Sequence, residues 1–400
     1  MTRLVPANLD ELRDAVAVAL AAEEPVEIVG GGSKRGLGRP LQTPHLLDLS
    51  RLAGIREYEP SELVLTAGGA TPLAEIERAL AEHGQMLAFE PPDWRGLLGG
   101  EGKATLGGVL ACNLAGPRRI KAGAARDHFL GFRGVSGRGE AFKAGGKVVK
   151  NVTGYDLCKL MAGSYGTLAA LEEVTVKVLP RPESVATVLF SGVGPAAAVR
   201  LMNAALGSPH EVSGAAYLPA GSGAVPPRAV ALRVEGPTPS VAFRRDALAR
   251  EYAVVAPAEF LAGAESAALW RAVGDASPLA GLGEQAVWRI SVAPARGAEL
   301  AEAIARQLDT VWFLDWGGGL LWVAVPEADD GGAAAIRNAI RGAEGRDTGH
   351  GTLVKASPAL RRAVEVFEPQ PPGLAALSRR VKEAFDPRHI LNPGRMAEGL

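Results

Sequence analysis

Residues 145–180 read GGKVVKNVTGYDLCKLMAGSYGTLAALEEVTVKVLP, and the glycines of this stretch divide it into a helix, a turn and a strand. An apolar-periodic helix is predicted over residues 157–162 and ends at Gly163, since glycine commonly follows a helix C-terminus. Residues 164–167 form a tight polar turn, and alternating valines in residues 171–179 predict a half-buried strand. Glycine tolerates positive φ and leaves room for a ligand. We therefore expect the backbone of this unit to approach a ligand or another segment at two glycine-rich points.

A triple-glycine loop lies further towards the N-terminus, after a short buried strand predicted over residues 26–29. The loop begins with Gly30, Gly31, Gly32, Ser33 and Lys34. Successive backbone amides in such a loop can form an anion-binding nest, to which a hydroxyl and a charge are added here. The loop is either a phosphate cradle or a flexible connection. It is not followed by the Gly-Lys-Ser/Thr of a P-loop, and no Gly-x-Gly-x-x-Gly opens a helix.

A second glycine segment, residues 103–113, reads KATLGGVLACN. Gly107 and Gly108 precede a short helix predicted over residues 109–114, and amides at a helix start attract anions or carbonyl oxygens. The most basic segment of the chain follows and includes Arg118 and Arg119. It is either a solvated loop or a surface that docks a partner or binds a carboxylate.

Composition excludes several classes of protein. The chain has 400 residues, enough for two or three domains, with 43 basic and 44 acidic residues, so nucleic acid is not expected as the main partner. Two cysteines, Cys112 and Cys158, are too few for a disulfide framework or an iron–sulfur cluster. The first residues predict an amphipathic helix rather than a signal peptide, and no apolar run is long enough to span a membrane. We therefore expect a soluble cytoplasmic protein.

The C-terminal half alternates predicted strands and helices. Strands are expected over residues 185–190, 226–235, 254–255, 287–292, 311–315 and 320–325, and helices over residues 195–206, 240–251, 298–307 and 332–343. Antiparallel strands with helices on one face predict an α+β unit. Its tryptophans, Trp270, Trp288, Trp312, Trp316 and Trp322, are expected in the core rather than on a binding platform.

Three signatures occur in a fixed order: the loop at Gly30, Thr105-Leu106-Gly107-Gly108 with Asn113, and KNVTGYDL at residues 150–157 with GSYGTL at 163–168. This order resembles the FAD-binding domain of the vanillyl-alcohol-oxidase/PCMH superfamily, in its 2-hydroxy-acid oxidase branch. The match covers residues 26–180, and FDPRHILNPGR at residues 385–395 is similar to the ending of that branch. LAGPRR at residues 114–119 looks most like the E-type FAD-binding subunits of bacterial glycolate oxidase.

The resemblance implies an α+β fold with a two-subdomain PCMH-type FAD-binding domain at residues 1–181. A smaller α+β cap would follow at 182–370, and a C-terminal segment at 371–400 would return to the FAD domain. FAD would lie extended between loops, so no Rossmann motif is needed. The implied cofactor-binding residues are Gly30, Gly31, Gly32, Ser33, Lys34, Thr105, Gly107, Gly108, Asn113, Gly154, Gly163, Gly166, Thr167 and Asn392.

The chemistry implied is hydride removal from Cα of a 2-hydroxy acid, which needs a base, a cation for the carboxylate and an electron acceptor. Self-sufficient relatives carry a longer phrase with two histidines and often a metal, whereas this chain has only Gly349-His350-Gly351, so no metal is expected. His350 is the candidate base, or else a structural residue. Arg118 and Arg119 are the candidate cations, or else docking residues.

The resemblance also implies partners: a homologous catalytic flavin subunit and an iron–sulfur subunit of glycolate oxidase in glyoxylate metabolism, with membrane contact only through them. The substrate would be a small 2-hydroxy acid. Two alternatives stay open. The chain could be a self-sufficient FAD-dependent 2-hydroxy-acid dehydrogenase, or a non-catalytic structural flavin subunit.

Overall fold

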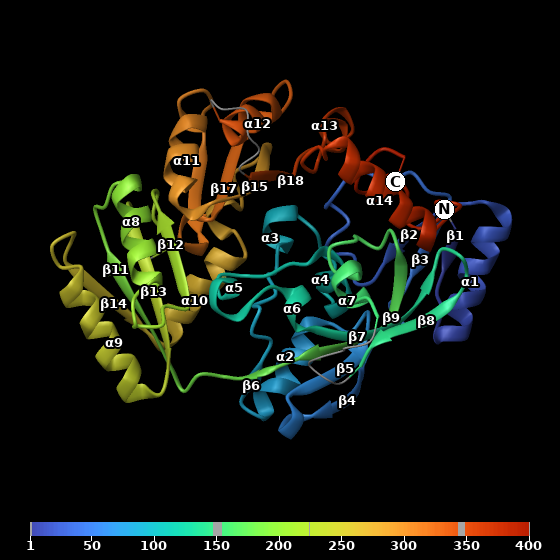
Figure 1. The fold of residues 1–400 in the computed structure, drawn as a ribbon, viewed down its shortest axis with the longest axis horizontal. Helices are drawn as coiled ribbons and strands as arrows, with labels where there is room; N and C mark the ends of the chain where they lie inside the picture. The colour runs from blue at the N-terminus through green and yellow to red at the C-terminus, as the bar shows by residue number, and fades with distance from the viewer. Residues whose placement is uncertain (1, 147–153, 224, 343–348, 400) are drawn as a thin grey trace.

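The computed structural model describes residues 2–146, 154–223, 225–342 and 349–399, and Figure 1 shows the arrangement of its elements. Lys150 to Thr153 of the third signature lie outside these ranges. The predicted class is confirmed: helices and sheets are mixed, with an N-terminal domain followed by a cap. In Figure 1 the C-terminal end of the chain lies near the N-terminal end.

The first subdomain is a parallel three-stranded sheet in the order β1-β3-β2, with α1 against it. Its elements are β1 (Thr2–Leu4), α1 (Leu9–Ala22), β2 (Val26–Val29) and β3 (His45–Asp48). The predicted N-terminal helix is capped by Asn8, whose Oδ1 accepts a hydrogen bond from the Glu11 amide at 2.9 Å. β2 runs directly into the triple-glycine loop.

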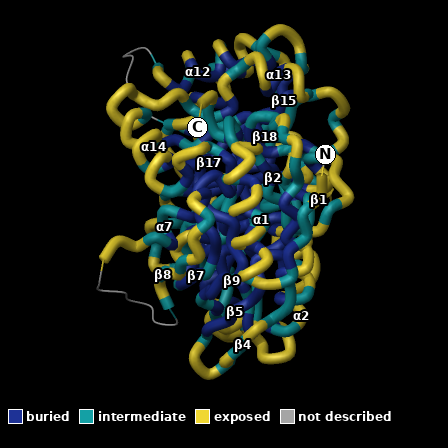
Figure 2. Tube along the Cα trace, turned by 90° about the vertical axis from the view of Figure 1, so that its right-hand side faces the viewer, coloured by how far each residue is buried: buried dark blue, intermediate teal, exposed yellow. Residues whose placement is uncertain are grey.

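The second subdomain is an antiparallel sheet in the order β4-β5-β9-β7-β8. Its strands are β4 (Ile55–Glu59), β5 (Val64–Gly68), β7 (Phe129–Ser136), β8 (Ala141–Gly145) and β9 (Ala169–Lys177), and a separate pair joins β6 (Gln85–Met86) to β10 (Leu179–Pro180). Its helices are α2 (Leu73–Glu82), α3 (Arg95–Leu98), α4 (Leu106–Cys112), α5 (Arg119–Ala122), α6 (Ala125–His128) and α7 (Leu157–Met161). α7 and β9 confirm the predicted helix–turn–strand unit, but β9 is buried along almost its whole length rather than half-buried, because it lies between β5 and β7. Figure 2 shows β5, β7 and β9 in the buried interior.

The cap repeats one βαββαβ pattern twice. The first copy contains β11 (Ser184–Phe190), α8 (Pro195–Leu206), β12 (Gly214–Leu218), β13 (Ala229–Gly236), α9 (Thr238–Glu251) and β14 (Ala258–Ala262). The second contains β15 (Gln285–Val292), α11 (Gly297–Ala305), β16 (Val311–Asp315), β17 (Leu320–Pro326), α12 (Ala333–Arg341) and β18 (Gly349–Lys355). The copies join through β12 and β16 in one sheet, β14-β11-β13-β12-β16-β17-β15-β18, so β14 and β18 are its edges.

The two faces of this sheet have different neighbours. The four repeat helices pack on one face, and the other face shares a hydrophobic core with the N-terminal domain. Trp270, Trp288, Trp316 and Trp322 are buried, as predicted. The strand predicted at residues 254–255 is wrong, since these exposed valines lie in a turn before the proline that precedes β14. The missed helix α10 (Gly263–Gly274) covers β11.

The C-terminal segment contains α13 (Pro358–Ala363) and α14 (Pro372–Phe385). After α14 the chain runs beside β2: the Val26 amide donates to Ile390 O at 2.8 Å, and the Asn392 amide donates to Val26 O at 3.1 Å. Lys382 of α14 is 3% exposed and donates to the carbonyl oxygens of Thr167 and Leu391. A segment more than 360 positions later therefore completes the structure around β2 and its glycine loop.

Candidate cofactor site

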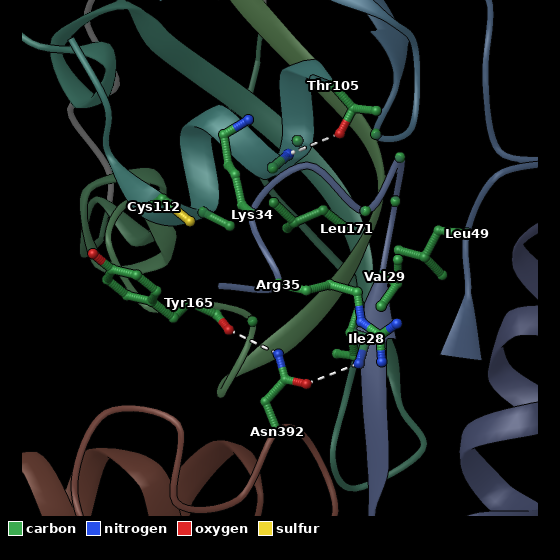
Figure 3. Close-up of a pocket in the computed structure, with 18 of the residues that line it drawn as sticks. Ile28, Val29, Lys34, Arg35, Leu49, Thr105, Cys112, Tyr165, Leu171 and Asn392 are labelled. Atoms are coloured by element: carbon green, nitrogen blue, oxygen red, sulfur yellow. Dashed lines mark hydrogen bonds between the residues drawn. The ribbon is translucent and has the colours of Figure 1, made fainter. Parts of the chain in front are cut away.

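A pocket lies where four segments meet: the loop after β2, the start of α4, the turn after α7, and the C-terminal segment (Figure 3). Ten of the predicted cofactor residues line this pocket: Gly30, Gly31, Gly32, Ser33, Lys34, Thr105, Gly107, Gly108, Gly166 and Asn392. Three separate sequence signatures thus converge on one cavity, as an extended cofactor would require.

The start of α4 presents backbone to this pocket. Thr105 is the N-cap, and its Oγ1 accepts a hydrogen bond from the Gly108 amide at 3.3 Å. Gly107 and Gly108 therefore lie inside the first turn, and the helix begins three residues earlier than predicted. A Cβ on Gly107 would stand 2.6 Å from Gly69 O, so only glycine allows this approach.

Two cations flank the glycine loop. Lys34 Nζ donates to Ser33 Oγ at 3.2 Å, burial lowers the pKa of Lys34, and no ion pair with Lys34 occurs within the described ranges. Arg395 donates from Nη1 to Leu37 O at 3.1 Å and from Nη2 to Glu27 Oε1 at 3.1 Å. Its Nε is buried and has no hydrogen-bond partner in the described part of the chain. These free donors, with the loop amides, fit the diphosphate of FAD.

Asn392 ties the two sides of the pocket together. Its Oδ1 accepts from the Ile28 amide at 2.8 Å, and its Nδ2 donates to Tyr165 O at 2.8 Å, as the dashed lines in Figure 3 show. Asn392 has φ 44°, a left-handed conformation that asparagine tolerates better than most residues. A Cβ on Gly166 would lie 2.8 Å from Asn392 Nδ2, which explains that glycine.

Four predicted cofactor residues do not line the pocket. Asn113 ends α4 in the left-handed region, and its Oδ1 accepts from the Arg126 amide at 3.0 Å. Gly163 lies next to Asn113, and Thr167 is buried with its Oγ1 bonded to Ser164 O at 2.7 Å. Gly154 is exposed, with φ +81° and open space where a Cβ would be. Asn113, Gly163 and Thr167 lie in the elements that frame the pocket.

Sequence reasoning missed Tyr165 and Arg395 as pocket residues, although both lie inside quoted signatures. Tyr165 has φ 54°, and its ring packs against Phe367 with centroids 5.0 Å apart. Arg395 closes the Asn-Pro-Gly-Arg phrase, and its charge could have indicated an anion site. Cys112 also lines the pocket, where burial raises its pKa to about 11.

The two candidate arginines have separate environments. Arg118 pairs with Glu90 at 3.1 Å and with Glu235 of the cap at 2.6 Å, and Glu90 also pairs with Arg233 at 2.8 Å. This buried network joins the two domains and leaves Arg118 no free charge. Arg119 instead lies over the ring of Trp316, with its Cζ 4.4 Å from the centroid.

His350 lies on the edge strand β18, opposite Ser291 of β15, and is exposed. Partial loss of hydration and the charge of Arg289 lower the pKa of His350; Glu368 opposes this shift, and Arg119 adds to it. His350 therefore lies within electrostatic range of Arg119. In the described ranges, no three His, Cys, Asp or Glu side chains gather as metal ligands.

Comparison with known proteins agrees with this geometry. The FAD binding domain family matches residues 3–145, and the C-terminal domain of FAD linked oxidases matches residues 360–396. Glycolate oxidase subunit GlcE of Escherichia coli K12 is 35% identical over 96% of each chain. Glycolate oxidase subunit GlcD of Bacillus subtilis is 30% identical over 46% of this chain and 38% of its own. Substrate-bound p-cresol methylhydroxylase has the same fold, with TM-score 0.73 and 13% identity over 99% of this chain and 88% of its own.

The fold and the pocket define an FAD-binding flavoprotein of the PCMH type within the FAD-linked oxidoreductases. More narrowly, the chain belongs to the family of the glycolate oxidase subunit GlcE, as its near full-length match shows. No helix in the described ranges has the length and apolar character needed to cross a membrane.

Proposed function

We propose that this chain is the FAD-carrying subunit of a complex that oxidises glycolate or a related 2-hydroxy acid and passes the electrons through its flavin to a partner subunit. The observation that supports this most is the match to glycolate oxidase subunit GlcE across 96% of both chains. The pocket adds to it, because the donors that FAD needs are free there.

Oxidation of a 2-hydroxy acid to a 2-oxo acid removes two electrons and two protons, and bound FAD supplies the acceptor for the electron pair. In this proposal Lys34, Arg395 and the amides of the Gly30 loop hold the diphosphate. Asn392 fixes the distance between the β2 end and the turn at Tyr165. His350 is the proposed base: its lowered pKa keeps the imidazole neutral near pH 7, which lets it accept the hydroxyl proton.

The proposed partners are a homologous catalytic flavin subunit and an iron–sulfur subunit. The printed names of two relatives, subunits GlcE and GlcD, support a multi-subunit assembly. The chain has only Cys112 and Cys158, so an iron–sulfur cluster would reside in a partner. We also propose that the protein is cytoplasmic and contacts the membrane only through its partners.

We further propose that the domains divide at residues 181 and 370. Arg361 lies before the second boundary, yet its Nη1 already donates to the Gly36 and Gly38 carbonyl oxygens of the N-terminal domain.

The test is the visible spectrum of the purified full-length chain, followed by anaerobic addition of glycolate with and without the partner subunits. The proposal expects a flavin spectrum that bleaches when the partners are present. Bleaching by the isolated chain would favour the self-sufficient dehydrogenase. A flavin that glycolate never reduces, in any combination, would favour the structural subunit, and a chain that binds no added FAD would refute the proposal.

A further inference from the structure

Trp316 occupies an unusual position on the cap face that meets the N-terminal domain. It follows β16 with φ 53°, a strained backbone conformation for a bulky residue. Asp315 Oδ1 accepts from the Trp316 amide at 2.7 Å, and the indole Nε1 donates to Gly116 O at 3.2 Å. The ring is thereby held at the domain interface by one bond from each domain.

Two arginines from different domains form cation–π contacts with this ring. Arg119 of α5 lies with its Cζ 4.4 Å from the Trp316 centroid, and Arg289 of β15 with its Cζ 4.9 Å from the same ring. Both are half-buried, and neither side chain has a hydrogen bond or ion pair to a described residue. Burial and then the charge of Arg119 lower the pKa of Arg289 to about 10. Two like charges thus lie against one ring without a salt bridge to a described residue, although the charges of Asp127 and Asp315 act on them.

Other arginines nearby are ion-paired, so the lack of an ion pair is particular to Arg119 and Arg289. Arg118 and Arg233, only a few residues or strands away, are satisfied by Glu90 and Glu235. Among the described residues, no acidic side chain forms such an ion pair with Arg119 or Arg289: Asp127 acts on Arg119 only through its charge, and Asp315 is bonded to the Trp316 amide. The guanidinium N–H groups of the Trp316 pair are therefore available to an anion.

The strand register places Arg289 near His350: on β15, Arg289 pairs with Thr352 and Ser291, two residues on, pairs with His350 of β18. Tyr165 lines the cofactor pocket, and the charge of Arg289 lowers the pKa of Tyr165 against the larger effect of burial. Both arginines also act on His350. A small anion held by Arg289 would therefore lie on the face of β15 that His350 adjoins, within electrostatic range of the pocket residue Tyr165.

We propose that Arg119 and Arg289, stacked on Trp316, bind the carboxylate of the hydroxy acid at the domain interface. This inference rests on the proposed function and deepens it by assigning the site of the substrate's charge. Guanidinium groups match a carboxylate with paired N–H donors, and stacking on the indole restricts their motion beforehand. Because one arginine comes from each domain, the site is complete only when the cap is docked.

The test uses the full-length chain loaded with FAD and titrated anaerobically with glycolate and with glycolamide, which has the same size but no charge. Binding is read from the flavin absorption and from tryptophan fluorescence, with Trp316→Phe identifying the Trp316 signal. R119M and R289M each remove a charge at nearly constant volume, and R289K keeps the charge but loses the planar fork. R126M is the matched control, since Arg126 is exposed on the neighbouring helix α6.

The expected result is that glycolate binds wild type and R126M alike, and binds R119M and R289M about 10- to 100-fold more weakly, because charged hydrogen bonds are lost. R289K should fall between, and glycolamide binding should not change. Glycolate binding that is undetectable in wild type, or unaffected in both R119M and R289M, would overturn the inference. Failure of the proposed function would look different: glycolate would bind by these signals, yet never reduce the flavin in the assembled complex.

Discussion

Asn392→Ala tests the idea that the C-terminal segment holds the cofactor pocket together. The substitution removes the acceptor for the Ile28 amide and the donor to Tyr165 O, both at 2.8 Å, from a side chain in a residue only 3% exposed. It also places alanine at φ 44°. Each unpaired backbone group costs roughly 1 kcal/mol or more. The left-handed conformation of alanine adds about 1 kcal/mol.

The expected loss in the free energy of unfolding is therefore roughly 2 to 4 kcal/mol, measured by urea denaturation followed by circular dichroism. FAD affinity, measured by titration of flavin fluorescence, should fall as well, since Ile28 and Tyr165 both line the pocket.

The matched control is Asn338→Ala, on the exposed side of α12, which should change stability by less than about 0.5 kcal/mol. If Asn392→Ala were as stable as this control and bound FAD as tightly as wild type, Asn392 would not join the two sides of the pocket.

Three further predictions concern buried charges. Lys382→Met leaves Asp386 buried without its partner at 2.5 Å and should lower the free energy of unfolding by about 3 to 5 kcal/mol in urea; a loss below about 1 kcal/mol would contradict this. Burial alone would raise the pKa of Glu235, but Arg118 and Arg233 lower it from 4.5 to about 2. Glu235 thus adds stability above pH 4.5 that is lost as pH falls towards 2, about 3 kcal/mol in all, and Glu235→Gln should flatten that part of the pH–stability profile. Lys34→Met should weaken FAD binding by about tenfold and reduce its salt dependence, with Lys34→Arg retaining both; equal affinities at every salt concentration would argue against a diphosphate contact.

The cofactor loops were predictable because their signals are local. A buried strand followed by three glycines, and a Thr-x-Gly-Gly helix start, specify backbone conformations within a few residues. The structure brings ten of the fourteen predicted cofactor residues to the wall of one pocket. Asn113 and Gly163 gave the same kind of local signal but do not line the pocket. Asn113 ends α4 with a left-handed backbone conformation, and Gly163 packs beside it.

The charged site could be predicted only in part: the sequence offered Arg119 as a candidate cation, but it did not separate Arg119 from Arg118 or indicate Arg289. Arg118 and Arg119 are adjacent in the sequence and equally basic, yet Arg118 faces Glu235, 117 positions later, while Arg119 faces Trp316. Arg289 is a charged residue within an otherwise apolar strand, which marks it as unusual. The sequence of the strand does not show which part of the protein its side chain contacts. The repeat in the cap is equally hidden, because its two copies share a pattern of elements without a shared motif.

The sequence by itself determined the class of the elements, the glycine loops and the FAD-binding family, since these depend on periodicity and on backbone conformations set by neighbouring residues. Only the tertiary structure decided which charges are neutralised and which stay free. Whether an arginine finds a carboxylate depends on where segments hundreds of residues apart come to lie. The physical reason is that electrostatic energy follows distance in space and burial, neither of which is encoded in the spacing along the chain.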